Sequence, residues 1–248
     1  MTLKSTYSAE MRSQLGLFPV WPPGDPIKAG DIGTLQGGVF EKQTSLKERF
    51  GTLKVRLVRQ ALDRPYRFCS KDCVLGEIRA AGKAAGTGSA AMQVKFGANG
   101  GVIFEAAGLT RQAIDNLYEV RSFIREHRTA WPAGHVLIGS VDRATRFRVL
   151  ISENRNGSAT LSGKLDALKD LKVADASVKV STDASAGYQV NDGSGAVSAS
   201  VYGFGWIPAA LKGFKLLQAE PEAAPAGAGS DEDFVALAAD RFPADRYA

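Results

Sequence analysis

The sequence predicts an α+β protein: a twisted antiparallel sheet with long amphipathic hairpins and one or more packed helices. Residues 176–190 alternate between apolar or small side chains and polar ones, which is the period of a strand with one buried face. Residues 110–128 instead repeat their apolar positions with the period of a helix. With 44% hydrophobic residues, the 248-residue chain can form one substantial core.

The first half of the chain predicts mainly turns and strands. Its first forty residues contain four prolines and six glycines, which favour turns and short edge strands over a helix. Residues 51–58 alternate and predict a strand whose polar side is basic. Residues 80–101 are mostly small, and every second residue from Met92 to Phe96 is apolar. This stretch predicts either another amphipathic strand or a mobile loop.

The clearest predicted helix begins at an N-cap on Thr110 and ends near Arg128, just before the Trp-Pro-Ala-Gly sequence at 131–134. Residues 135–139 then predict a buried strand, and residues 145–152 its partner.

A long hairpin is predicted over residues 176–207, after a shorter strand at 158–165. The residues Asn-Asp-Gly-Ser-Gly at 191–195 tolerate the positive φ that a tight turn needs. A second alternating run, 197–207, forms the other arm. The first arm is longer than the ~5–6 residues of an ordinary strand and than the about 9–11 residues that cross a membrane.

The C-terminal residues predict a separate appendage. Residues 218–230 are rich in Ala, Pro and Gly and predict a flexible linker. Residues 231–240 carry an N-cap, an acidic first turn and apolar residues at helical spacing, so we expect a short acidic helix within the tail 231–248. Residues 1–217 would then form a single β-rich α+β domain.

Charge is distributed unevenly along the chain. Residues 216–248 contain seven acidic and two basic residues, a net charge of −5, which leaves +10 on the preceding residues because the whole chain carries +5. Either the tail folds against the basic body, or the body binds anionic lipid or nucleic acid. Arg143, Arg146 and Arg148 are interleaved with apolar residues, as on the solvent face of a sheet, and no nucleic-acid-binding motif accompanies them. We therefore do not expect a nucleic-acid partner.

No pattern in the chain predicts an enzyme. The phosphate-binding loop, the dinucleotide-binding fingerprint and the Gly-x-Ser-x-Gly nucleophile motif do not occur in the sequence. His127 lies at the end of the predicted helix and His135 begins a predicted strand, which suits structural roles. Cys69 and Cys73 predict two free cytosolic thiols, because a four-ligand zinc site would need distant histidines. We predict no catalytic residue, no cofactor and no metal.

Residues 68–216, taken in order, resemble the pore-forming domain of gasdermins, particularly the compact bacterial and fungal members. The segments that carry the resemblance are the small-residue stretch 84–96 leading into 102–105, the helix around Leu117 and Tyr118, the segments 136–141 and 146–152, the long hairpin, and the closing segment 201–206.

The resemblance implies a protein of bacterial defence and cell death whose amphipathic segments unfurl into membrane hairpins. It implies homo-oligomerisation on anionic membrane lipid, and a C-terminal element that restrains the chain until a protease or partner protein releases it. The lack of an apolar secretory signal in residues 1–10 predicts a cytoplasmic protein, which on activation would move to the inner face of the membrane.

Three groups of residues are the candidates for these roles. The candidates for membrane insertion are Val94, Phe96, Val178, Val180, Tyr188, Val197 and Val201. The candidates for lipid-headgroup binding are Lys54, Arg56, Arg59, Arg64 and Arg67, and those for the autoinhibitory tail are Phe234, Leu237 and Phe242. A soluble β-rich binding or scaffold module, whose C-terminal helix recruits a partner, shares every feature except membrane activity and stays open as the alternative.

Overall fold

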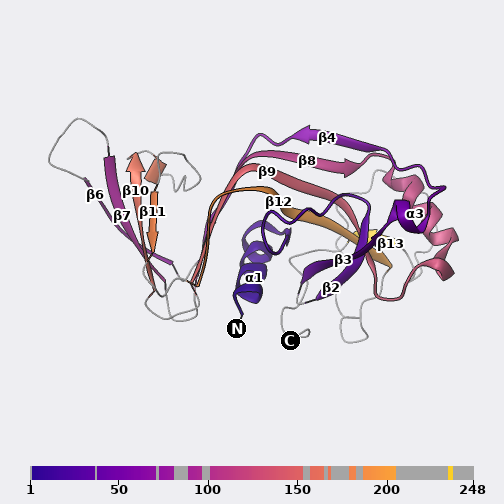
Figure 1. Cartoon of the computed structure of the whole chain (residues 1–248), viewed down its shortest axis with the longest axis horizontal. Helices are drawn as coiled ribbons and strands as arrows, with labels where there is room; N and C mark the ends of the chain where they lie inside the picture. Colours follow the sequence, from indigo (N-terminus) through magenta and orange to yellow (C-terminus); the bar gives the residue numbers. More distant parts are fainter. Residues whose placement is uncertain are drawn as a thin grey trace, which may run out of the picture.

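The computed structural model describes residues 2–36, 38–70, 73–80, 89–96, 101–152, 157–164, 167–168, 179–182, 187–204 and 234–236. Its strands form two antiparallel sheets, one of nine strands and one of four (Figure 1). A few helices pack against the larger sheet. The predicted class, α+β with an antiparallel sheet, is confirmed.

Three long strands form the centre of the large sheet: β8 (Gly101–Ile114), β9 (Val136–Ser152) and β12 (Tyr188–Phe204). β9 pairs with β8 on one side and with β12 on the other. β4 (Leu57–Ala61) and β5 (Tyr66–Cys69) follow one another along the far side of β8.

Shorter strands complete the large sheet. β1 (Phe18–Pro19) and β13 (Phe234–Ala236) pair with the outer side of β12. β2 (Asp31–Gln36) pairs with the start of β9 and with β3 (Val39–Ser45).

The small sheet contains β6 (Cys73–Ala80), β7 (Ser89–Phe96), β10 (Ser158–Lys164) and β11 (Lys179–Thr182). Its strand order is β11-β10-β7-β6. It stands apart from the body, beyond one end of the long strands, at the left of Figure 1.

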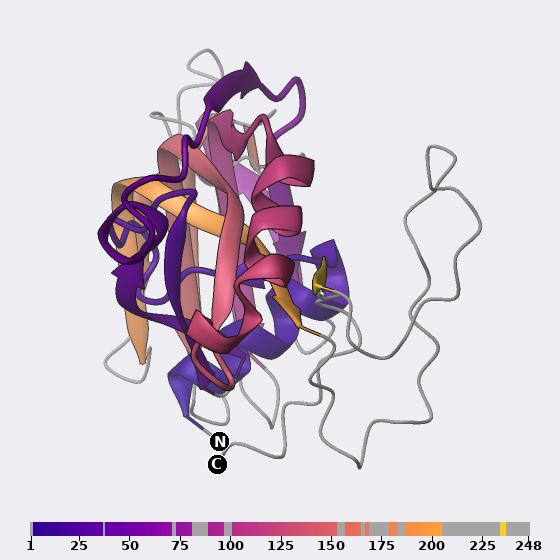
Figure 2. The same cartoon turned by 90° about the vertical axis from the view of Figure 1, so that its right-hand side faces the viewer.

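Two helices, α1 (Leu3–Leu15) and α3 (Leu117–Glu126), pack against the large sheet. α1 lies under the arch of long strands, where Tyr7 and Met11 pack against Phe104 and Phe147. α3 lies against the other end of the sheet (Figure 2) and buries Val120 and Ile124. The one-turn helix α2 (Leu46–Arg49) and the 3-10 helix η1 (Arg128–Ala130) complete this end. No helix in the described ranges is long and apolar enough to cross a membrane.

The prediction of turns and short strands for the N-terminus is wrong for its first fifteen residues. α1 begins at a capping box between Thr2 and Ser5 and ends at Gly16, whose φ of 65° is left-handed. The prolines and all other glycines of this region follow that cap. These prolines and glycines therefore end α1 on its C-terminal side, but they do not stop the preceding residues from forming a helix.

The predicted hairpin turn at 191–195 is also wrong, because these residues lie inside the single strand β12. Positive φ does occur there, at Asp192 (58°) and Gly195 (120°). It produces β-bulges against β9, where the register shifts. The residues that could have closed a hairpin instead bend one long strand.

Other predicted boundaries moved. Residues Thr110–Ile114, predicted as the start of the helix, end β8, because they pair with β4 and β9; α3 starts only after Asn116. The two strands predicted at 135–139 and 145–152 are one strand, β9. The strand predicted at 51–58 is β4, shifted to Leu57–Ala61. The strands predicted around Met92 and at 158–165 are confirmed as β7 and β10.

Candidate functional site

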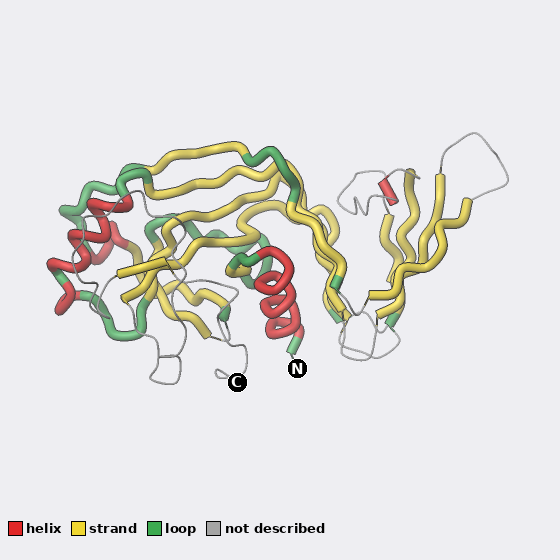
Figure 3. Tube along the Cα trace, turned by 180° about the vertical axis from the view of Figure 1, so that it is seen from behind, coloured by secondary structure: helices red, strands yellow, loops and turns green. Residues whose placement is uncertain are grey.

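The small sheet continues the large one strand by strand. β5 leads into β6, β7 into β8, β9 into β10 and β11 into β12 (Figure 3). The neighbours in the large sheet are β5-β8-β9-β12, and the corresponding neighbours in the small sheet are β6-β7-β10-β11. Both sheets therefore have the same order. We call the place where the four strands pass from one sheet to the other the junction. It lies between Cys69 and Cys73, Phe96 and Gly101, Ser152 and Ser158, and Thr182 and Tyr188.

An apolar cluster spans the junction. Ile103 of β8 and Leu150 of β9 pack in one buried cluster with residues of β7 and β10, and the partly buried Cys69 and Cys73 pack against it. The small-sheet members of this cluster include Ala90, Met92, Val94, Phe96, Ala159 and Leu161. The residues between them, such as Gln93, Lys95 and Thr160, are exposed. Each of these two strands therefore has one apolar and one polar face.

The first crossing of the junction leads from Cys69 to Cys73. Cys69 ends β5, Cys73 begins β6, and the Cys73 amide donates to the Ser70 carbonyl at 3.0 Å. The two cysteines do not form a disulfide. A hydrogen bond between the two thiols raises the pKa of Cys69 and lowers that of Cys73. The Ser70 hydroxyl also lies 3.3 Å from the Cys73 sulfur.

A row of alternating charges crosses the large sheet close to the junction. Arg67 of β5 lies opposite Glu105 of β8, with Nε 3.7 Å from Oε1. Glu105 lies opposite Arg148 of β9, and both are buried. Arg148 Nη2 is 3.6 Å from Oδ1 of Asp192 on β12. Arg67, Glu105, Arg148 and Asp192, which we call the charge row, therefore take one residue from each of the four continuing strands.

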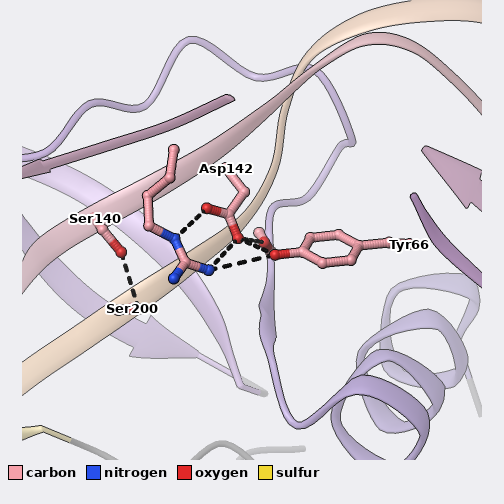
Figure 4. A network of polar contacts seen from close by, with 6 residues as sticks. Tyr66, Ser140, Asp142 and Ser200 are labelled. Carbon is pink, nitrogen blue, oxygen red and sulfur yellow. Dashed lines mark hydrogen bonds and ion pairs between the residues drawn. The ribbon is translucent and has the colours of Figure 1, made fainter. Parts of the chain in front are cut away.

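A second polar group connects the same four strands farther from the junction (Figure 4). Buried Asp142 of β9 accepts hydrogen bonds from Arg111 of β8 at 2.7 and 2.9 Å and from Ser198 of β12 at 3.0 Å. The Tyr66 hydroxyl of β5 donates to it as well. Burial, with this hydrogen bond, raises the pKa of Tyr66 to about 12. Hydrogen bonding to Asp142 also raises the pKa of Arg111, so the guanidinium stays charged.

The C-terminal tail contacts the large sheet. Phe234, Val235 and Ala236 form β13 and pair antiparallel with Phe204, Gly203 and Tyr202 of β12. The helix predicted at 231–240 is therefore wrong at these three residues. Here the pattern of apolar residues was compatible with either element, and the unpaired edge of β12 supplied the hydrogen-bond partners for a strand.

The candidates for membrane insertion fall in different environments. Val94 and Phe96 are buried in β7, on its apolar face. Val197 and Val201 lie in β12 and are buried in the core of the large sheet. The Tyr188 ring contacts the Trp21 ring in a tilted arrangement, with 5.0 Å between ring centroids. Val180 lies in β11, and Val178 lies outside the described residues.

The headgroup candidates gather around the β4 and β5 side of the sheet. Lys54, Arg56, Arg59 and Arg64 are exposed, whereas Arg67 is half-buried in the charge row. Arg56 also forms ion pairs with Asp115 and Glu119, at 3.4 and 3.7 Å. Of the tail candidates, Phe234 begins β13, and Leu237 and Phe242 lie outside the described residues.

Sequence reasoning missed Glu105, Asp142 and Asp192. One signal was available: Asp142 is the only acidic residue in strand β9, whose other charged residues are all arginines. A buried acid in such a strand needs a cationic partner. Its partner could not be identified from the sequence, because Arg111 lies 31 residues away and meets it only through the pairing of β8 with β9.

No protein-family model and no curated protein matches the chain. Among solved structures, a bacterial gasdermin from Bradyrhizobium tropiciagri aligns with 81% of this chain and 87% of its own length. The identity is 15% and the TM-score is 0.31. This likeness is weak and does not by itself assign a fold family or a function.

Proposed function

We propose that the chain is a gasdermin-like pore-forming protein. In this proposal the small sheet swings outward at the junction, the hairpins β6–β7 and β10–β11 enter the bilayer, and copies assemble side by side on the membrane. The observation that carries the proposal is the shared strand order of the two sheets. Straightening one bend would give a continuous four-stranded sheet in which no strand changes its neighbour.

The composition of the hairpins supports their insertion. β7 and β10 alternate apolar and polar residues, as a membrane strand with one lipid face and one water face must. β6 and β7 have eight residues each and β10 has seven. A crossing needs about 9–11 residues, so residues of the junction would supply the remainder.

Restraint by the tail is the second part of the proposal. β13 occupies the outer edge of β12, an edge that would otherwise be open to another strand. Because β13 is only three residues long and follows the predicted linker 218–230, cutting that linker would leave the strand to dissociate. An activating protease, or a partner that pulls on the tail, would therefore release the body.

Anionic lipid is the proposed membrane partner, because residues 1–215 carry a net charge of +10 and each well-placed Lys or Arg contributes about 1 kcal/mol of binding to such a surface. The proposed protein is cytoplasmic and moves to the inner face of the membrane. Pore formation makes and breaks no covalent bond, so no catalytic residue and no cofactor is proposed.

The proposal can be tested on the full chain with a specific protease site inserted within residues 221–230. The folded protein is added to dye-loaded vesicles of phosphatidylcholine and phosphatidylglycerol, and is then cut. We expect dye release only after cutting. Sedimentation with the vesicles should follow the same pattern. If the cut protein releases no dye and stays in solution, the pore-forming function is wrong and the soluble binding module is favoured.

A further inference from the structure

We infer that the outer edge of β5 in one copy of the chain binds the outer edge of β12 in a second copy, with Arg67 of the first opposite Asp192 of the second. The inference rests on the proposed function, since it names the contact through which the assembled copies would meet. Four observations support it: the charge row, the open strand edges, the number of strands between them and the register.

The charge row ends in opposite charges at the two edges. Arg67 is positive on β5, and its side chain is 29% exposed. Asp192 is negative on β12, and its side chain is 64% exposed. Between them Glu105 and Arg148 alternate in sign. A second copy placed beside the first would continue the alternation, because Asp192 would then face the partner copy's cation.

Beside the charge row, the outer edges of β5 and β12 can each accept a strand of a second copy. Among the described strands, β5 pairs only with β8. On the outer side of β12, β1 pairs at Ser198 and Ala199, and β13 pairs from Tyr202 onward. The Val20 and Gly24 amides also donate to the Val197 and Ala196 carbonyls on this side. Among the described residues this leaves the stretch of β12 from Val190 to Gly193 without a backbone partner on its outer side, and such an edge presents free backbone donors and acceptors.

The number of strands fixes the relative direction of the copies. β5, β8, β9 and β12 alternate in direction, so β12 runs opposite to β5. A neighbour in the same orientation therefore presents a β5 that is antiparallel to β12. The two edges differ, so the contact is head-to-tail and can close into a ring. If the copies are related by a rotation about an axis parallel to the strands, each residue lies at the same level along that axis in every copy.

The pairing register of the four strands also aligns a second row of residues, beside the charge row. Cys69 pairs with Ile103, Ile103 with Leu150, and Leu150 with Gln189. If the copies meet as inferred, Cys69 of one copy lies opposite Gln189 of the next. Within one copy the two residues are three strand spacings apart, about 14 Å. A disulfide between them cannot form within one copy, because it needs a Cα separation below about 7 Å.

Cross-linking tests this contact. The variant Cys73→Ser/Gln189→Cys keeps the native Cys69 and leaves the charge row intact. It also carries the cleavable tail described above. We expect that oxidation on the phosphatidylglycerol vesicles after cutting gives a ladder of dimers, trimers and larger species on a non-reducing gel. The control Cys69→Ser/Cys73→Ser/Gln189→Cys can form dimers at most.

A charge variant tests the ion pair separately. Asp192→Asn removes the negative end of the row at an exposed position, and we expect it to raise the protein concentration needed for half-maximal dye release about tenfold. Asp192→Glu should restore most of the activity. Asp63→Asn, which removes the same charge at another exposed position, should have no effect.

The outcomes separate the two proposals. Dye release by the cysteine variant without a ladder overturns the contact between β5 and β12 and leaves the pore-forming function standing. Equal activity of Asp192→Asn and Asp63→Asn overturns the role of the ion pair. If the cut wild-type protein releases no dye, the proposed function fails and this contact between copies fails with it.

Discussion

Asp142 connects the four continuing strands through side-chain hydrogen bonds. It is buried and accepts hydrogen bonds from side chains of three other strands. Removing one partner of a buried ion pair leaves the other uncompensated, at a cost of about 3–5 kcal/mol. Arg111 is partly exposed, which places Asp142→Ala near the lower end, a loss of about 3 kcal/mol measured by urea unfolding.

Ser200→Ala is the matched control for this prediction. It removes only the neutral hydrogen bond of 2.9 Å between Ser140 and Ser200 in the same region, and we expect a loss of about 1 kcal/mol. Equal losses in the two variants would show that Asp142 contributes no more than an ordinary hydrogen bond.

Tyr66 makes stability depend on pH in the alkaline range. Its pKa is raised from 10 to about 12 by burial and by the hydrogen bond to Asp142. The folded chain therefore holds this proton more tightly than the unfolded chain. The resulting stabilisation is complete below pH ~10 and is lost as the pH rises from about 10 to about 12.

Tyr66→Phe tests this dependence, because phenylalanine has no proton to lose. We expect a shallower fall of the unfolding free energy between pH 10 and 12 than in the wild type, measured by urea unfolding at several pH values. Buried Tyr7, whose pKa is also raised by burial, should keep part of the slope. An unchanged slope in Tyr66→Phe would contradict the assignment.

At the scale of the element, the alternation of β7 is predicted to separate a lipid face from a water face. Met92 is buried and the adjacent Gln93 is exposed, so the two side chains point to opposite faces. Met92→Trp and Gln93→Trp form a matched pair. After the tail is cut, brominated acyl chains should quench the fluorescence of Trp at 92 and leave that of Trp at 93. Similar quenching at both positions would exclude a strand with one lipid face.

The strand β13 gives a second prediction at this scale. Proline lacks the amide hydrogen that a strand donates to its neighbour. In antiparallel pairs alternate residues are hydrogen bonded, so Val235→Pro/Ala236→Pro removes at least one contact with β12. We expect dye release from the uncut chain and faster proteolysis of the tail. Ala223→Pro, in the segment already rich in proline, should leave the uncut chain inactive.

The strands themselves were predictable from the sequence to a useful extent, whereas their connections were not. Alternation identified β7 and β10, because one face of each is buried. The same signal around residues 191–195 was interpreted as a hairpin, since positive φ serves turns and bulges equally well. Only the pairing with β9 distinguishes them, and that pairing joins distant residues, Gly193 with Phe147 and Gly195 with Ala144. The shared strand order of the two sheets, which defines the junction, follows from such pairings and could not be predicted.

For the whole molecule, the important balance is between the basic body and the acidic tail. In the proposed function, the body stays in solution while β13 is in place and binds anionic lipid when it leaves. The exposed cations around β4 lie on the opposite edge of the sheet from β13. They are therefore not covered by that strand. In that proposal, release would also change the net charge of the particle.

This arrangement predicts that the cations near β4 control membrane binding before any strand inserts. Arg59→Gln/Arg64→Gln removes two exposed charges, each contributing about 1 kcal/mol at an anionic surface. We expect binding of the cut protein to phosphatidylglycerol vesicles to weaken about thirtyfold, measured by sedimentation at low salt. The difference should shrink as salt increases, because exposed charges are screened beyond ~10 Å at 0.1 M ionic strength. Lys28→Gln/Lys47→Gln removes the same charge from exposed positions flanking β2 and β3. If both pairs weaken binding equally, net charge alone attracts the protein to the membrane, and the edge formed by β4 has no special role.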